Sequence, residues 1–415
     1  MDNIFVSLDA LLYTLGISIL LVIAYALNSR NAQSNYKKET IKPKSGTGDT
    51  VQHAKALEIY EDLRQSPSWW SDEKLFEVEK RAIFSKTWLF VTHASRFQKP
   101  GDYRTFDIAG FSFIVILGKD KEIRAFHNVC RHRAYAVTKK ESGSSTVLGC
   151  RYHGWSYDTR GKLVKAPEFD KVPGFDKETN GLWEIKTSIV LSMVYVNFDA
   201  STHVDSFDLH GSEVLLRKWS VSKMKCLEEW KTEGAFNWKL LGTLSPQEEK
   251  KQKRWYVILP GLGAGSRVDL ELGHTTIMRR IGPNIILILK AVPKSAKSTT
   301  LECSIYANDH LTTIDMDSLR SELNWEIKQL TARQQRIMRN EEPIMALASL
   351  VAKQGELNRL LGVHIAAEKN AGGEIYPAVR EQSFSREGKV DDDFCRELEN
   401  PGSTCNANAK GLLDW

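Results

Sequence analysis

Two cysteine–histidine pairs carry the clearest chemistry in this sequence. Cys130 and His132 form one pair, and Cys150 and His153 form the other, with seventeen residues between the two arms. Each arm supplies a thiolate and an imidazole, which are ligands for soft and borderline metals. A zinc finger usually has a cysteine pair followed by a histidine pair, whereas both arms here are mixed. The pattern favours a [2Fe–2S] cluster with two cysteines on one iron and two histidines on the other.

Two alternatives remain for these four residues, namely a zinc site and a set of surface side chains without a metal. In a cluster, neutral imidazoles would lower the negative charge and raise the reduction potential. The other cysteines show no paired spacing, and we expect them to be free thiols in a reducing compartment. They are Cys226, Cys303, Cys395 and Cys405.

A small all-β domain is predicted to position the two arms. An amphipathic helix over Asp72–Trp88 comes first, and short strands follow it. The predicted strands are Leu89–Thr92, Tyr103–Ile108, Phe111–Leu117, Ile123–Asn128, Val147–Leu148, Trp155–Tyr157 and Val190–Phe198. The turn Gly118-Lys119-Asp120-Lys121 joins two of these strands into a hairpin.

Three segments extend the pattern beyond the ligands. They are NVCRHRAYAV, GCRYHGWSYDTRGKLVKAP, and the upstream stretch IFSKTWLFVTHASRFQKPGDYRTFDIAGFSFIVILG. Together they resemble the N-terminal half of Rieske non-haem iron oxygenases, of the fungal choline monooxygenase-like and ring-hydroxylating alpha-subunit type. The resemblance implies that Gly154 and Trp155 shape the second cluster loop. It also implies that Ser156 and Tyr157 lie near the sulfides without being ligands.

The predicted organisation is α+β with five segments. They are a transmembrane anchor at 5–28, a flexible linker at 29–60, a Rieske [2Fe–2S] domain at 61–210, a helix-grip-like α+β domain at 211–382, and a polar tail at 383–415. The second domain is predicted to hold strands at Trp255–Leu259, Ile285–Val292 and Thr299–Tyr306, then helices at Ser318–Met338 and Pro343–Lys369. It reads as truncated or damaged after Leu241.

The mononuclear iron of such oxygenases lacks recognisable ligands in this chain. The resemblance implies two histidines and one carboxylate, with the histidines on a helix just after an Asn-Trp-Lys sequence. Asn237-Trp238-Lys239-Leu240-Leu241 is present, but GTLSPQEEKKQKRWYVILPGLGAG follows it without a histidine. Three explanations stay open: a gene-model error around residues 242–265, a true loss of the iron, or ligands at unrecognised positions.

Later residues do not assemble an obvious iron site in the sequence. The remaining histidines are His274, His310 and His364, and none of their spacings is the close helical one that a pair of iron ligands needs. A structural role is the expectation for each of them. The candidate carboxylates are Asp309, Asp315 and Asp317, and nothing in the sequence singles one out.

The N-terminus is predicted to be a membrane anchor. Leu11–Leu27 contains no charge over 17 residues, which is just enough for a helix to cross a bilayer core. A signal peptide would need a basic start, although Ala24-Tyr25-Ala26 resembles a cleavage site. A buried core helix would be amphipathic, whereas this segment is apolar on all sides. Arg30 and the lysines after it place the body of the protein in the cytosol by the positive-inside rule.

The functional expectation is an oxidoreductase that takes electrons from a flavin- or ferredoxin-type reductase. A monooxygenase acting on a small molecule, with a [2Fe–2S] cluster and Fe(II), is what the resemblance implies. The alternative is a non-catalytic Rieske electron carrier or inactive homologue. Choline-like amines or lipophilic molecules are the candidate substrates, and the family suggests a homotrimer. A formal net charge of +5, with both signs interspersed, gives no argument for nucleic acid.

Overall fold

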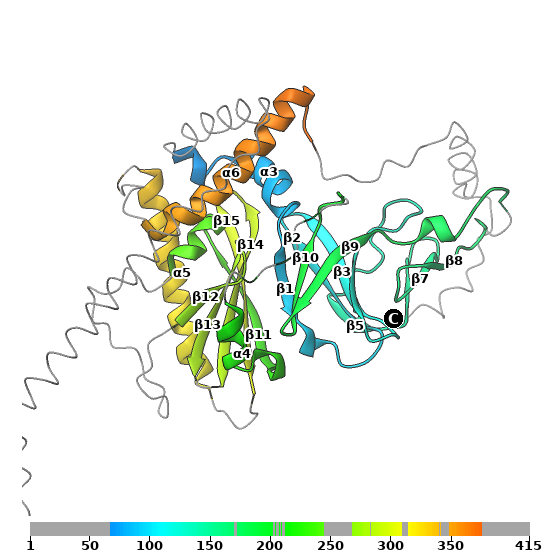
Figure 1. Ribbon diagram of the computed structural model, residues 1–415, viewed down its shortest axis with the longest axis horizontal. Helices are drawn as coiled ribbons and strands as arrows, with labels where there is room; N and C mark the ends of the chain where they lie inside the picture. The colour runs from blue at the N-terminus through cyan, green and yellow to red at the C-terminus, as the bar shows by residue number, and fades with distance from the viewer. Residues whose placement is uncertain are drawn as a thin grey trace, which may run out of the picture. The chain divides into compact units, whose positions relative to one another are not determined.

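The computed structural model describes residues 67–375, apart from 170–171, several positions between 202 and 211, 245–267, 283, 309–313, 340 and 342–347. Three antiparallel sheets and a set of helices make up this part of the chain (Figure 1). The predicted strand Trp255–Leu259, the linker and the polar tail lie outside the described residues.

A seven-stranded sheet forms the body of the first domain, with strand order β1-β10-β9-β4-β3-β2-β5. Its strands are β1 (Leu89–His93), β2 (Asp102–Ile108), β3 (Phe111–Leu117), β4 (Ile123–His127), β5 (Ser142–Ser144), β9 (Glu184–Val190) and β10 (Met193–Asn197). Strand β3 lies between β2 and β4, and its middle four residues are buried, as the apolar run FSFIVIL predicts.

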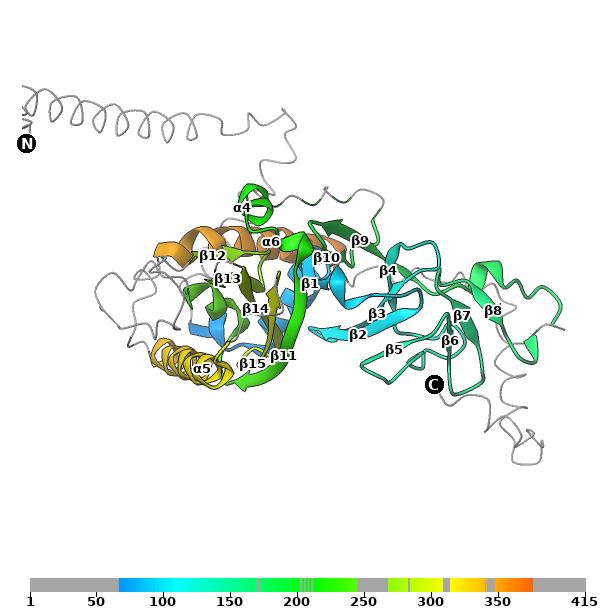
Figure 2. The same ribbon diagram turned by 90° about the horizontal axis from the view of Figure 1, so that it is seen from below.

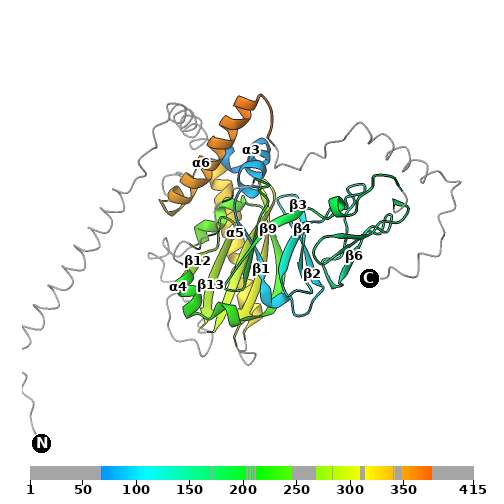
Figure 3. The same cartoon turned by 45° about the vertical axis from the view of Figure 1, so that its right-hand side comes forward.

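A three-stranded sheet, in the order β6-β7-β8, completes the first domain. Its strands are β6 (Val147–Gly149), β7 (Ser156–Asp158) and β8 (Leu163–Lys165). Figures 2 and 3 show this small sheet beyond β4 and β5, on the side away from the five-stranded sheet of the second domain. It packs on a second apolar cluster shared with the seven-stranded sheet, which includes Cys130, Cys150, Tyr157 of β7 and Phe126 of β4.

The second domain holds a five-stranded sheet with the order β11-β15-β14-β13-β12. The strands are β11 (Lys225–Gly234), β12 (Val268–Glu271), β13 (Thr276–Gly282), β14 (Ile285–Ser295) and β15 (Ser298–Ala307). Its helices are α4 (Glu213–Lys218), α5 (Met316–Met338) and α6 (Ala348–Ala371). Helix α5 packs against β11, whereas α6 packs against α3 (Glu73–Glu79) and the π-helical turn Lys80–Phe84 that continues it.

One hydrophobic core joins elements of both domains. It contains Phe84 and Val194 from the first domain, and Leu287, Ile305 and Leu361 from the second. Because each of these side chains is fully buried, removing either domain would expose the apolar face of the other.

Most predicted strands agree with the structure within one or two residues, but Val190–Phe198 was wrong as a single strand. The chain reverses at Leu191 and Ser192, whose φ angles are +50° and +65°, so β9 ends and β10 begins there. Such a two-residue turn normally carries glycine or asparagine, because other side chains favour negative φ. Neither residue is present at this turn, and the sequence therefore shows no turn signal.

The predicted membrane anchor is contradicted. A spanning helix needs about 20 predominantly apolar residues, and no helix of the described residues is long and apolar enough to cross a bilayer. The two long helices, α5 and α6, carry charged side chains along their length. Residues 5–28, where the anchor was predicted, lie outside the described part. The predicted single-pass membrane localisation with a cytosolic body depended on that helix and is withdrawn with it.

Candidate metal centre

Two loops of nearly identical backbone geometry hold the predicted ligands. In the first loop, which follows β4, the Cys130 N–H donates to the Tyr135 carbonyl at 2.7 Å, and the Ala134 N–H donates to the Cys130 carbonyl at 3.0 Å. In the second loop, between β6 and β7, the same two bonds join Cys150 with Trp155 at 2.8 Å and with Gly154 at 3.0 Å. Each cysteine therefore sits at the same position of a closed turn.

Both turns need a left-handed residue four positions after the cysteine. Gly154 has φ +74° and Ala134 has φ +56°. Glycine adopts this conformation freely, whereas alanine is strained in it by roughly 1–2 kcal/mol. Ala134 and Gly154 each lie four positions after a cysteine, and this equal spacing in the sequence could have revealed that the two turns correspond.

The structure brings the four predicted residues together and sorts them by type. Cys130 and Cys150 are free, buried thiols, and they lie close enough for each to shift the pKa of the other. The His132 and His153 rings lie 4.5 Å apart between centroids, at an interplanar angle of 75°. Each loop thus contributes one member to a cysteine pair and one member to a histidine pair.

The two thiols shift each other's pKa in opposite directions. The neighbouring Cys130 lowers the pKa of Cys150, against the opposing effect of burial, and Cys150 together with burial raises the pKa of Cys130. Binding a metal by both sulfurs would release the protons that the thiols carry.

Tyr157 reaches the first of these sulfurs. Its hydroxyl lies 3.2 Å from Cys130 Sγ and accepts a hydrogen bond from the Arg131 N–H at 3.0 Å. Burial raises the pKa of Tyr157, so the hydroxyl keeps its proton and can donate it toward the sulfur. Ser156, the other residue expected here, donates instead to the Gly154 carbonyl at 2.9 Å and braces the second loop.

Aromatic rings surround the histidine side of the centre. Trp155 stacks on His132 with centroids 5.0 Å apart and an interplanar angle of 11°. Phe169 meets the same imidazole edge-on at 5.1 Å, and it also packs against Trp155. The sequence interpretation included Trp155 but missed Phe169, because that residue follows the last strand of the small sheet and belongs to no ligand motif.

The Asn-Trp-Lys sequence forms a buried structural contact. Lys239 Nζ pairs with Glu79, and both side chains are 1% exposed. The Trp238 indole N–H donates to the same carboxylate at 2.8 Å. The ammonium also lies over the rings of Trp69, Trp70 and Trp238, at 4.5, 5.8 and 5.6 Å from their centroids. Burial lowers the pKa of Lys239, and the charge of Glu79 opposes this effect.

The other candidate iron ligands are dispersed. His364 Nε2 on α6 lies 3.0 Å from the Glu368 carboxylate, which also accepts a hydrogen bond from the Arg81 guanidinium at 2.8 Å. His274 lies in the turn between β12 and β13. Asp315 caps the N-terminus of α5 by accepting from Ser318, and Asp317 lies in the first turn of that helix.

His310 and Asp309 belong to the gaps, as does the stretch 245–267. Within the described residues, no group of three or more His, Cys, Asp or Glu side chains is close enough to hold one metal ion. The predicted cluster site is not a group of this kind, because each iron of a Rieske cluster takes only two protein ligands.

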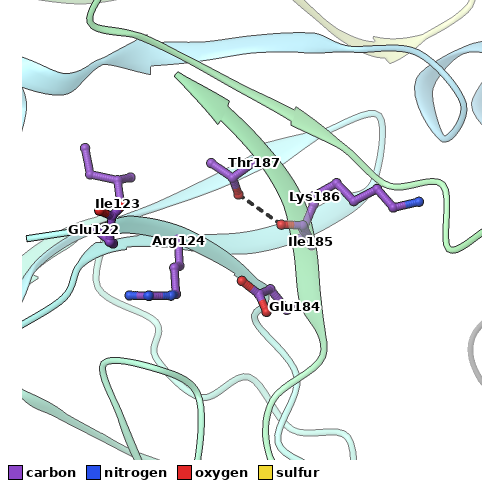
Figure 4. Close-up of a pocket in the computed structure, with 7 residues that line it drawn as sticks. All are labelled: Glu122, Ile123, Arg124, Glu184, Ile185, Lys186 and Thr187. Atoms are coloured by element: carbon purple, nitrogen blue, oxygen red, sulfur yellow. Dashed lines mark hydrogen bonds between the residues drawn. The ribbon is translucent and has the colours of Figure 1, made fainter. Parts of the chain in front are cut away.

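A separate cavity of about 430 Å³ opens where β4 and β9 part (Figure 4). Its two basic side chains already have partners: Arg124 makes two 2.9 Å bonds to Asp120, and Lys186 binds the Asp199 carbonyl at 2.8 Å. Glu122 and Glu184 also line the cavity. The Thr187 hydroxyl donates to the Ile185 carbonyl, as Figure 4 shows. This cavity offers no convergent reactive groups.

Comparison with known proteins agrees with the geometry of the two loops. Residues 87–176 match the Rieske [2Fe–2S] domain family. The chain is 34% identical over 175 residues to the carnitine monooxygenase oxygenase subunit of Acinetobacter pittii, covering 42% of this chain and 47% of that protein. It is 40% identical over 133 residues to the 2-aminobenzenesulfonate 2,3-dioxygenase alpha subunit of an Alcaligenes species, covering 31% and 34%.

The matched region spans half or less of these curated relatives. The fold likeness extends further. A crystal structure of a quaternary ammonium Rieske monooxygenase with gamma-butyrobetaine superposes with a TM-score of 0.57 at 23% identity, covering 71% of this chain and 98% of that one. At this identity the likeness concerns the fold alone.

Proposed function

Because this chain carries a Rieske [2Fe–2S] domain and is related to the Rieske non-haem iron oxygenases, we propose that it binds the cluster through Cys130, Cys150, His132 and His153. The cysteines would hold one iron and the histidines the other. The sorting of the four side chains into like pairs carries this proposal. A zinc site would instead need all four donors around one ion.

The residues around the proposed ligands have defined tasks. The bound cluster supplies electrons one at a time to an acceptor. The Tyr157 hydroxyl donates toward the Cys130 sulfur, Trp155 fixes the plane of the His132 ring, and Ser156 holds the second loop closed. Such neighbours orient the ligands of a metal site and tune its properties.

The function that fits this site best is that of the oxygenase component of a Rieske monooxygenase. A flavin- or ferredoxin-type reductase would supply the electrons, and O₂ and a small organic molecule would be the substrates. The relatives are named for substrates as different as carnitine and an aminobenzenesulfonate, so their names set no substrate for this chain. An assembly of several copies of the chain is part of the proposal, because one solved relative is described with inter-subunit electron transfer. The number three comes only from the family resemblance.

A quaternary ammonium substrate would not use the tryptophan cage found here. Rings of Trp69, Trp70 and Trp238 are the kind of surface that attracts such cations, but the ammonium of Lys239 already occupies that place.

A second candidate is an electron carrier without oxygenase activity. No histidine occurs between Lys239 and His274, where the resemblance places the iron ligands. His364 is held by Glu368, whose carboxylate also binds Arg81. In this case the second domain would serve as a scaffold for the cluster domain.

Metal analysis of the purified protein tests the ligands and separates the two functions. About three irons per two acid-labile sulfides support the oxygenase, and about two irons per two sulfides support the carrier. Cys130→Ser should abolish the visible absorption of the cluster, whereas the control Cys226→Ser should retain it. Zinc without sulfide would refute the proposed cluster site.

A further inference from the structure

A groove beside the proposed cluster has features of a docking surface. It has a volume of about 390 Å³, and Cys150 contributes to its wall. Tyr135 and Tyr152 line it, and their rings stack at a centroid distance of 4.2 Å and an angle of 26°. These side chains are 50% and 46% exposed. The stacked pair therefore presents apolar ring surface that a partner could cover.

The tyrosine pair leads directly to a proposed ligand. The Tyr152 ring meets the His153 ring at 4.0 Å between centroids, and His153 in turn lies beside His132. A partner that covers the tyrosines would therefore be separated from the histidine side of the cluster by a single aromatic layer.

Charge indicates the kind of partner. Among the described residues, every charged side chain that lines the groove is basic: Lys139, Lys140 and Arg151, all of them exposed. The floor is apolar, with Val137 and Leu148 buried. The next carboxylate along the chain, Glu141, is 88% exposed and lies 3.8 Å from Lys231 of the second domain. A surface with a basic rim and an aromatic centre is complementary to an acidic protein that presents an apolar side chain.

We infer that this groove is the docking site of an acidic one-electron donor protein. The inference rests on the proposed cluster, because an electron donor docked in the groove needs that cluster as its acceptor. Long-range attraction would increase the rate of encounter, and the tyrosine pair would bury apolar area in the complex.

The test measures how fast a reduced donor reduces the cluster. The probe is a chemically reduced plant-type ferredoxin, an acidic protein whose potential lies below that of Rieske centres. Stopped-flow absorbance compares the wild type with Lys139→Glu/Lys140→Glu and with the control Lys223→Glu/Lys225→Glu. The control makes the same change of net charge on exposed residues of the second domain. Reduction by dithionite serves as a measure that does not depend on docking.

At about 0.01 M ionic strength, the groove variant should be reduced by ferredoxin at least about tenfold more slowly than the control. The difference should shrink in 0.5 M salt, and the dithionite rates should remain equal. Equal rates of reduction by ferredoxin in the two variants would overturn the inference. The proposed function would stand in that case if both variants still showed the absorption spectrum of the cluster. Dissociation of an oligomer by the groove variant, with unchanged ferredoxin rates, would also overturn it and would assign the groove to a second copy of the chain.

Discussion

Tyr157 is expected to set part of the reduction potential. Its hydroxyl donates toward the sulfur of Cys130 and would stabilise the more negative, reduced cluster. Tyr157→Phe should therefore lower the potential. If the lost interaction differs by about 1.4 kcal/mol between the two redox states, the shift is about 59 mV for one electron. A redox titration followed by circular dichroism measures it.

Ser156→Ala is the control for the loop, because the Ser156 hydroxyl donates to the Gly154 carbonyl at 2.9 Å. A potential that moved equally in both variants would show that the effect comes from loosening the loop. An unchanged potential in Tyr157→Phe would remove the hydroxyl from the tuning of the centre.

Ala134 is the strained counterpart of Gly154, and replacing it should stabilise the protein. Ala134→Gly removes the left-handed strain at φ +56° and should raise the free energy of unfolding by about 1 kcal/mol. The control Ala136→Gly lies in the same exposed loop at a residue without positive φ, and it should lower stability slightly. Denaturant unfolding distinguishes the two, and a loss of stability in both variants would refute the argument.

At the scale of elements, the buried contact between Lys239 and Glu79 fastens helix α3 to the turn Trp238–Leu244 of the second domain. Lys239→Met would leave the Glu79 carboxylate buried without its cation. Because an uncompensated buried charge is costly, we expect a loss of about 3–5 kcal/mol in the free energy of unfolding.

Lys231→Met is the control for this contact, since Lys231 is 59% exposed and lies 3.4 Å from Glu302. An exposed pair of this kind contributes about 1 kcal/mol at most. The double variant Glu79→Gln/Lys239→Met should recover part of the lost stability. If Lys239→Met costs no more than the control, the tryptophan cage and its ion pair do not hold the two elements together.

At the scale of the whole molecule, His93 links the domains and makes their stability depend on pH. Its ring contacts the Val221 carbonyl at 3.1 Å and packs against Tyr306 of β15 at 5.0 Å. Burial lowers the pKa of His93 to about 4, from 6.5 in an unfolded chain. Below pH 6.5 the unfolded chain binds a proton that the folded protein rejects, so stability falls as the pH drops toward 4.

The difference between the two pKa values corresponds to a loss of about 3 kcal/mol. His93→Gln should flatten the dependence of unfolding free energy on pH between 7 and 4. Both proteins carry the same cluster site, so its acid sensitivity affects them equally and the comparison isolates the histidine. Parallel pH curves for the two proteins would contradict this assignment.

Local signals account for what the sequence predicted well. The hairpin at Gly118–Lys121 and the long helices depend on turn residues and periodicity within short stretches, and the structure has the corresponding elements. The four predicted ligands lie together in the structure, and their role as cluster ligands stays a prediction. The turn at Leu191-Ser192 was missed because tertiary pairing of β9 with β10 overrides the preference of those two residues. The cage around Lys239 was beyond sequence reasoning, because its partners Trp69 and Glu79 lie more than 150 positions away.

The matched turns of the two cluster loops have a mechanical consequence. One turn follows β4 of the seven-stranded sheet and the other belongs to the three-stranded sheet, so a cluster bound to both would act as a covalent cross-link between them. By chain-entropy reasoning, a cross-link that closes a loop of about 15 residues contributes about 3 kcal/mol. Oxidative loss of the cluster would then do more than end electron transfer. It would remove this cross-link and leave the small sheet held by the apolar cluster that joins Tyr157 of β7 with Phe126 of β4, so we expect the segment to become more sensitive to proteases.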